Sequence, residues 1–412
     1  MSEIRPFRAL RPRPELARQV AAPPYDVISS EEARQLAAGN ELSFLHITKP
    51  EIDLPPEVDL YDDRVYAKGV SNLRRLIAEG VLIREDTPSY YVYQQRMGNH
   101  VQAGVVGAAS CAEYEQGLIK RHEFTRKDKE DDRTRHVDEQ NANAEPVFFT
   151  YRQRQEIDAL VEQVRSTQPI YDIVTEDGIG HTVWIVPPHL TDAVTAAFAQ
   201  VPALYVADGH HRTASAARVG LERRAANPHH RGDEPYNYFM AVLFPHDQLQ
   251  IMDYNRVVKD LAGLTPNRFL ALLADKFTVA PTDTPRPAAP KQFGMYLDGR
   301  WYRLTANPGT YPENDPVRSL DVSILQENVL APLLNIRDPR TDKRIDFVGG
   351  IRGLGELERR VREGWAVAFA LFPTSLDQLM SVADSGQVMP PKSTWFEPKL
   401  RSGLLVRTLD VW

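Results

Sequence analysis

Cysteine is almost absent from the sequence, and this excludes two kinds of cross-link. Cys111 is the single cysteine among 412 residues, so neither an intramolecular disulfide nor a zinc site built from several thiolates can form. Cys111 itself is predicted to be a small buried side chain on a strand. Apolar runs of the ~20 residues that span a bilayer are also missing, as is the apolar core of a signal peptide. We therefore expect a cytoplasmic protein with no membrane partner.

Basic residues are in deficit as well. The chain has 49 lysines and arginines against 56 aspartates and glutamates, a formal net charge of -7. Proteins that bind nucleic acids usually carry a basic excess, because neutralising the phosphates supplies much of the affinity. The acidic balance therefore counts against a nucleic-acid partner. A local basic pocket for a small anionic ligand remains compatible with it.

The length and the residue patterns bound the architecture. A chain of 412 residues favours about two or three domains. Strand and helix patterns alternate along it, so we expect an α/β (α+β) fold with mixed sheets. We predict three segments, 1–150, 151–280 and 291–412, with the proline-rich stretch 281–290 as a linker or surface loop. Among the shorter patterns, residues 43–48 are predicted to form a strand.

The strongest local signal is the segment Ala207-Asp-Gly-His-His-Arg212, which lies between a buried-strand pattern and a helix pattern. Gly209 lets the backbone turn tightly and approach a ligand closely. The helix that follows begins with unpaired N–H groups at its positive dipole end, which suits a phosphate. This arrangement predicts an anion site at the turn.

The side chains of this segment add to that prediction. Arg212 offers a planar donor fork for phosphate oxygens, and His210 and His211 can donate, accept or take up a proton near neutral pH. Asp208 could hold a metal ion or orient a histidine. The alternative is a capping turn, in which Asp208 caps the helix and the histidines are satisfied locally.

A further candidate site precedes this segment in the sequence. At the end of a strand-like segment, Lys120 and Arg121 could bind phosphate while His122 or Glu123 acts as a general base on a hydroxyl. The very charged residues 126–136 that follow fit a solvated helix face equally well.

Two proline pairs present the remaining candidates. One pair makes rigid a loop that offers Lys392, Ser393 and Thr394, with Lys399 just beyond, as nucleotide or phosphate contacts. The alternative for this loop is a structural one, packed by the aromatic residues beside it. The other pair precedes Asp26 and fixes its loop, so this carboxylate could serve as a base or a metal ligand.

With these motifs in this order, the chain resembles a bacterial and archaeal family, domain-of-unknown-function family one thousand and fifteen. The strand–turn–helix unit also resembles the ParB/sulfiredoxin-like superfamily, in which the equivalent Gly-x-x-Arg turn binds nucleotide phosphates. Some members of that superfamily are kinases of free L-serine. The landmarks shared with the first family span almost the whole chain and are Ala22-Pro-Pro-Tyr-Asp-Val-Ile28, Lys120-Arg-His-Glu123, Lys129-Glu-Asp-Asp-Arg133, Ala207-Asp-Gly-His-His-Arg212, Leu320-Asp-Val-Ser323 and Met389-Pro-Pro-Lys-Ser-Thr394.

The resemblance implies a ParB/sulfiredoxin-like core with long N- and C-terminal segments and a phosphate site at residues 209–212. It points to a nucleotide-dependent phosphotransferase that acts on free L-serine or a similar hydroxy acid, with ATP or ADP as donor. Mg²⁺ would lie near Asp208, and the base would be Glu123 or, as second choice, Asp26. The alternatives are a non-catalytic nucleotide-binding regulator of the ParB-like type, and a phosphatase or nuclease at the same anion site. The sequence does not decide the oligomeric state, and it is compatible with a homo-oligomer.

Overall fold

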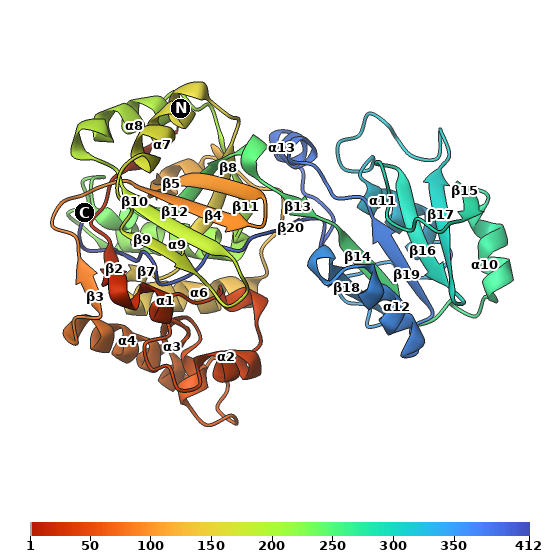
Figure 1. Ribbon diagram of the computed structural model, residues 1–412, viewed down its shortest axis with the longest axis horizontal. Coiled ribbons are helices and arrows are strands. Elements are labelled where there is room, and N and C mark those ends of the chain that lie inside the picture. The colour runs from red at the N-terminus through yellow and green to blue at the C-terminus, as the bar shows by residue number, and fades with distance from the viewer. Residues whose placement is uncertain (1) are drawn as a thin grey trace. The chain divides into compact units, whose positions relative to one another are not determined.

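The computed structural model describes residues 2–412, so only Met1 of the predicted segment 1–150 lies outside the described residues. The contacts within the chain divide it into two compact units (Figure 1). One unit contains the residues up to Leu249 together with Pro398–Trp412, and the other is Gln250–Glu397. The division into three segments remains a prediction.

A mixed sheet forms the centre of the first unit and confirms the expected α/β class (Figure 1). Its strands follow the order β6-β11-β8-β12-β5-β4-β10-β9, and β1 pairs with β5. The pairs β6–β11 and β8–β12 are parallel and the others antiparallel. The strand bounds are β1 Ile4–Arg5, β4 Tyr91–Met97, β5 His100–Ser110, β6 Ile119–Lys120, β8 Val147–Tyr151, β9 Tyr171–Val174, β10 Gly180–Ile185, β11 Leu204–Asp208 and β12 Tyr238–Pro245.

Helices and short strand pairs complete this unit. The helix α9 packs against β8, β11 and β12, while α6 lies along α9 and α4. The short antiparallel pairs are β2 Leu10–Pro12 with β3 Leu82–Arg84, and β7 Ala142–Asn143 with β21 Arg407–Thr408. The helix bounds are α1 Ala17–Val20, α2 Ser30–Ala37, α3 Leu45–Thr48, α4 Asp63–Ala78, α5 Cys111–Glu115, α6 Lys127–Gln140, α7 Gln155–Arg165, α8 Thr191–Phe198 and α9 His210–Ala226.

One local prediction is wrong. The strand expected over residues 43–48 is the short helix α3. Phe44, Leu45 and Ile47 are all buried in one apolar cluster, and over six residues an apolar pattern does not distinguish a strand from one helical turn. Packing of α3 against α4 therefore decides the conformation.

The second unit is built on an antiparallel sheet with the order β15-β17-β16-β19-β14-β18. A short pair, β13 Ile251–Met252 with β20 Trp395–Phe396, lies outside that sheet. No helix among residues 2–412 is both long and apolar enough to cross a membrane. The other bounds in this unit are β14 Tyr254–Val258, β15 Phe277–Pro281, β16 Gln292–Leu297, β17 Arg300–Ala306, β18 Ile345–Gly349, β19 Val367–Leu371, α10 Pro266–Leu273, α11 Asp321–Leu325, α12 Leu354–Arg362 and α13 Leu376–Asp384.

Candidate functional site

The turn between β11 and α9 has the shape that its sequence predicts. β11 ends at Asp208, Gly209 adopts the left-handed conformation with φ 81°, and α9 begins at His210. A side chain is strained in this region of backbone conformation, whereas glycine is not. A Cβ atom at Gly209 would also lie only 3.1 Å from the Arg212 guanidinium carbon. The glycine is therefore needed both for the turn and for the close approach of Arg212.

Asp208 is held by two donors. Its Oδ1 atom accepts a hydrogen bond from the Gly209 backbone N–H at 2.9 Å, and its Oδ2 atom lies 2.9 Å from Nζ of Lys399. Burial alone would raise the pKa of Asp208, but the Lys399 and Arg212 cations lower it below its ordinary value. Asp208 is therefore ionised and already paired with a cation. Lys399 reaches it from the C-terminal segment that returns to the first unit.

Arg212 faces the interior of the unit. Its side chain is only 8% exposed, and its guanidinium donates to the Pro146 carbonyl at 2.8 Å and to Asp26 Oδ2 at 3.4 Å. Burial opposes the charged form, but the carboxylates of Asp26 and Glu145 outweigh it and raise the pKa of Arg212. No basic residue lies close to Asp26 in the sequence. The fold places Arg212, 186 positions away, against it.

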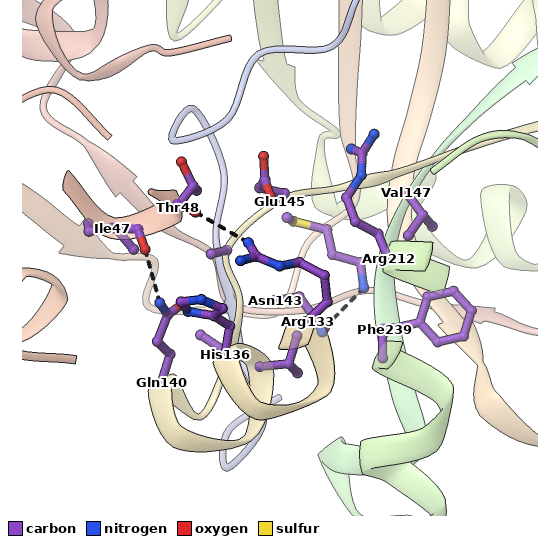
Figure 2. Close-up of a pocket in the computed structure, with 15 residues that line it drawn as sticks. Ile47, Thr48, Arg133, His136, Gln140, Asn143, Glu145, Val147, Arg212 and Phe239 are labelled. Carbon is purple, nitrogen blue, oxygen red and sulfur yellow. Dashed lines mark hydrogen bonds between the residues drawn. The ribbon is translucent and has the colours of Figure 1, made fainter. Parts of the chain in front are cut away.

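A small cavity of about 40 Å³ lies beside Arg212. Figure 2 shows Glu145, Arg133 and His136 around it, together with Arg212. Sites for small ligands usually measure about 300–1,000 Å³, so this cavity is too small for a nucleotide.

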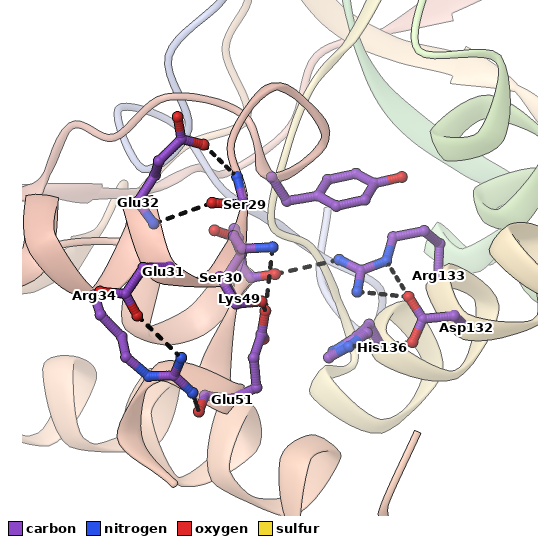
Figure 3. Close-up of polar contacts among 12 residues, drawn as sticks. Ser29, Ser30, Glu31, Glu32, Arg34, Lys49, Glu51, Asp132, Arg133 and His136 are labelled. Atoms are coloured by element: carbon purple, nitrogen blue, oxygen red, sulfur yellow. Dashed lines mark hydrogen bonds and ion pairs between the residues drawn. The ribbon is translucent and has the colours of Figure 1, made fainter. Parts of the chain in front are cut away.

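The Arg133 side chain, only 12% exposed, is paired on several sides. It donates to Asp132 at 2.7 Å (Figure 3). It also donates to the Thr48 carbonyl at 3.2 Å, and it lies 4.1 Å over the Tyr25 ring. The segment 126–136 is therefore more than a solvated helix face, because it supplies a buried cation next to the turn.

His122, Glu123 and His210 form a cluster on the other side of the turn. The parallel pairing of β6 with β11 aligns Lys120 with Tyr205, so the residues that follow both strands emerge together. The His122 and His210 rings lie 4.4 Å apart and perpendicular. His210 Nδ1 is 3.9 Å from Glu123 Oε2.

These two histidines are buried, neutral and incompletely paired. His122 is 2% and His210 6% exposed. Burial lowers the pKa of His122 to about 4 although the Asp208 carboxylate opposes this, and burial also takes the pKa of His210 well below its ordinary value. Among residues 2–412, Nε2 of His210 meets no hydrogen-bond partner, and the ring nitrogens of His122 have only a weak contact with the Val206 backbone. His211 differs, since its Nε2 accepts from the Arg126 backbone N–H at 3.0 Å.

The other basic candidates of the first unit, Lys120 and Arg121, lie at the end of β6, the strand that pairs with β11. Lys120 Nζ is 5.8 Å from the centre of the Tyr205 ring on β11. Arg121 donates to the Tyr114 hydroxyl at 3.3 Å, so its guanidinium contacts α5 rather than Asp208.

The loop candidates belong to the second unit. Lys392 contributes its carbonyl to a 2.9 Å hydrogen bond from Arg256, and Ser393 donates to the Pro390 carbonyl at 2.6 Å. Together with Thr394 they are part of Gln250–Glu397, so a contact between them and the turn remains a prediction.

The sequence predicts no site role for Glu145, and it predicts that Lys399 acts with the loop at residues 392–394 rather than with Asp208. Glu145 accepts from the Tyr25 backbone N–H at 3.1 Å and from the Ser402 hydroxyl at 2.8 Å. It stands alone in an otherwise uncharged stretch before β8, so no local pattern marks it. The only pattern near Lys399 that indicates a site is the proline pair before Lys392.

Comparison with known proteins gives a family and several distant structures. The family model described as "Protein of unknown function (DUF1015)" matches residues 4–323. No curated protein matches the chain.

Three of the similar solved structures share 11–13% sequence identity with the chain. A free serine kinase in complex with AMP is 11% identical over 70% of this chain and 88% of that chain, with a TM-score of 0.34. SbnI from Staphylococcus aureus, truncated at its C-terminus, is 12% identical over 73% and 87%, with a TM-score of 0.39. A conserved hypothetical protein from Pyrococcus furiosus is 13% identical over 72% and 94%, with a TM-score of 0.34. Such low scores carry no argument about activity.

Proposed function

This chain belongs to the DUF1015 family, and we propose that it is a nucleotide-dependent phosphotransferase acting on a small hydroxyl compound, of the class of free L-serine or a similar hydroxy acid. One observation carries the proposal: two carboxylates from distant segments lie against the first turn of α9. Asp26 Oδ2 is 3.4 Å from Arg212, and Glu123 Oε2 is 3.9 Å from His210. A phosphate site with a proton acceptor beside it is what phosphoryl transfer to a hydroxyl needs.

The phosphates would bind at the N-terminus of α9. The backbone N–H groups of residues 210–212 lie in the first turn of a 17-residue helix, where no preceding helical carbonyl can accept from them. They and the positive helix end favour an anion. Lys120 and Arg121 would add positive charge from the neighbouring strand end, and Lys392, Ser393 and Thr394 would add contacts if the second unit reaches the nucleotide.

The proton of the acceptor hydroxyl would go to a carboxylate. Glu123 is 44% exposed and Asp26 35% exposed, so both can face a substrate. Arg212 lies 3.4 Å from Asp26, and His122 is an alternative acceptor of the proton. Glu123 remains the first candidate and Asp26 the second.

A nucleotide donor, ATP or ADP, is part of the proposal, whereas the predicted Mg²⁺ contact at Asp208 needs a rearrangement. Mg²⁺ prefers six oxygen ligands, several of them water or substrate phosphate. Both oxygens of Asp208 already accept from Gly209 and Lys399, so the ion would have to displace the lysine. We therefore assign Asp208 the role of holding Lys399 beside the turn.

A phosphatase at the same anion site is a second candidate. Two imidazoles and a carboxylate, here His122, His210 and Glu123, are the ligand types of many hydrolytic metal centres. Such a centre would activate water rather than a substrate hydroxyl.

Phosphorus NMR on the full-length protein separates these candidates. The protein is incubated with ATP, ADP or pyrophosphate and a divalent cation, with and without a pool of hydroxy amino acids. The proposal predicts a phosphomonoester that forms only when an acceptor is present. Inorganic phosphate released at the same rate without acceptor would establish a phosphatase. Nucleotide binding without any turnover would instead establish the regulator.

A further inference from the structure

The histidines His122 and His210 present buried polar atoms that need a ligand. Nε2 of His210 has no hydrogen-bond partner among the described residues, and the ring nitrogens of His122 have only a weak contact with the Val206 backbone. Leaving a buried polar atom unpaired costs about 1–3 kcal/mol. Paired or metal-bound ring nitrogens are the rule inside proteins, so two adjacent, buried and poorly paired imidazoles indicate that something binds between them through one nitrogen of each ring.

We propose that His122, Glu123 and His210 bind one divalent transition-metal ion of the Zn²⁺, Mn²⁺ or Fe²⁺ class. One ligand atom from each of the three side chains lies within 4.8 Å of the other two. Bonds of about 2.0–2.2 Å to a tetrahedral ion place its ligands roughly 3.4 Å apart. Glu123 is the exposed member of the three. By turning toward the two buried imidazoles, its side chain can bring the ligand atoms most of the way to the separation that an ion requires.

The ligand types decide which ions fit. Imidazole nitrogen suits zinc and iron, and the carboxylate of Glu123 also suits manganese, whereas Mg²⁺ is bound by oxygen atoms and keeps much of its water. Metal binding also requires neutral histidines, and both imidazoles lie almost fully buried with their rings 4.4 Å apart. The cluster therefore selects a softer ion than the Mg²⁺ that the sequence predicts near Asp208.

The cluster lies where a bound ion would be next to the proposed phosphate site. Three protein ligands leave at least one coordination position open, as in catalytic rather than structural sites. His210 is the first residue of α9, so an anion at the helix N-terminus would lie next to that open position. The ion would then add positive charge where a phosphate binds. Metal binding itself does not depend on the proposed phosphoryl transfer.

Calorimetric titration of tag-free, chelator-treated, full-length protein tests the site. We expect one equivalent of Zn²⁺ or Mn²⁺ to bind, with Zn²⁺ at least about 100-fold tighter than Mg²⁺. Glu123→Gln and His210→Asn should each lower the Zn²⁺ affinity by about 100-fold or more, since losing even an outer partner of a ligand costs 10–100-fold. Cobalt substitution should give visible absorption bands that both variants lose.

His230→Gln is the matched control. It removes another histidine–carboxylate pair, His230 with Glu234 at 3.0 Å, beyond the opposite end of α9. Its metal affinity should equal that of the unchanged protein. Absence of saturable one-equivalent binding, equal Zn²⁺ and Mg²⁺ affinity, or full binding by Glu123→Gln would each overturn the proposal. Because Glu123 is 44% exposed, this variant should fold, and circular dichroism verifies that it does. Failure of the phosphotransfer assay would leave these binding results intact.

Discussion

The two sides of the β11–α9 turn differ in how their polar groups are paired. On one side, Arg212 contacts Asp26 and the Pro146 carbonyl and Asp208 contacts Lys399, although Nε of Arg212 meets no partner among residues 2–412. On the other side, Nε2 of His210 meets no partner among those residues, and His122 has only a weak contact with the Val206 backbone. The same backbone turn thus supports a network of charge pairs and a cluster of weakly paired, buried imidazoles. Charge pairs hold a structure in place, whereas weakly paired imidazoles can bind a ligand.

Arg212→Ala should produce the largest effect and should act on stability. It would leave the Asp26 and Glu145 carboxylates without their buried guanidinium, so we expect the free energy of unfolding to fall by about 3–5 kcal/mol. Urea unfolding measures this. Arg223→Ala, at the far end of α9, removes a more exposed pair with Asp138 and should cost less than about 1 kcal/mol. If Arg212→Ala is stable and only its nucleotide affinity drops, by about 1.5–3 kcal/mol, Arg212 binds phosphate and the comparison fails.

Glu123→Gln and Asp26→Asn should affect turnover rather than nucleotide affinity. Loss of a general base lowers turnover by about a hundredfold or more, and steady-state kinetics with the acceptor found by NMR measures it. Normal turnover by Glu123→Gln with an inactive Asp26→Asn would make Asp26 the base. If Glu123→Gln loses both metal and turnover while Asp26→Asn loses turnover alone, Glu123 is a ligand and Asp26 the base. Activity in both variants would contradict a carboxylate base here.

Gly209→Ala tests how tightly the turn is built. The left-handed backbone alone costs an alanine about 1–2 kcal/mol, and its Cβ atom would press on the Arg212 guanidinium. Gly98→Ala is the matched control, because Gly98 also has a positive φ but no atom within 4 Å of the added Cβ. We expect Gly209→Ala to lose more stability than Gly98→Ala in urea unfolding. Equal losses would show that the contact with Arg212 is unimportant.

Glu113, a carboxylate outside the turn, makes the stability of the folded protein depend on pH and so provides a further test of incomplete pairing. Burial raises the pKa of Glu113 to about 7, and its Oε2 atom has no partner among the described residues. Between its ordinary pKa of 4.5 and about 7, the folded state keeps a proton that the unfolded state has released, so stability falls as the pH rises. Glu113→Gln should remove this slope, which thermal unfolding at pH values from about 5 to 8 would detect. An unchanged slope would contradict it.

Much of the turn could be predicted from the sequence because its elements are local. A buried strand, a glycine and a helix start follow one another within residues 203–213, and each has its own pattern. The partners of the turn are not local: Lys399 lies 191 positions from Asp208, and Asp26 lies 186 positions from Arg212. Such pairs depend on the sheet order, which no motif encodes. The pairing of His122 with His210 likewise depends on the parallel register of β6 and β11.

A crystal structure with ADP and Zn²⁺ or Mn²⁺ tests the central claim most directly, namely that ligands bind on the incompletely paired side of the turn. The account predicts phosphate oxygens within about 2.7–3.2 Å of the backbone nitrogens of residues 210–212. It also predicts an anomalous peak between His122, Glu123 and His210. Phosphates bound instead against Arg212 and Glu145, with no metal at the histidines, would contradict it.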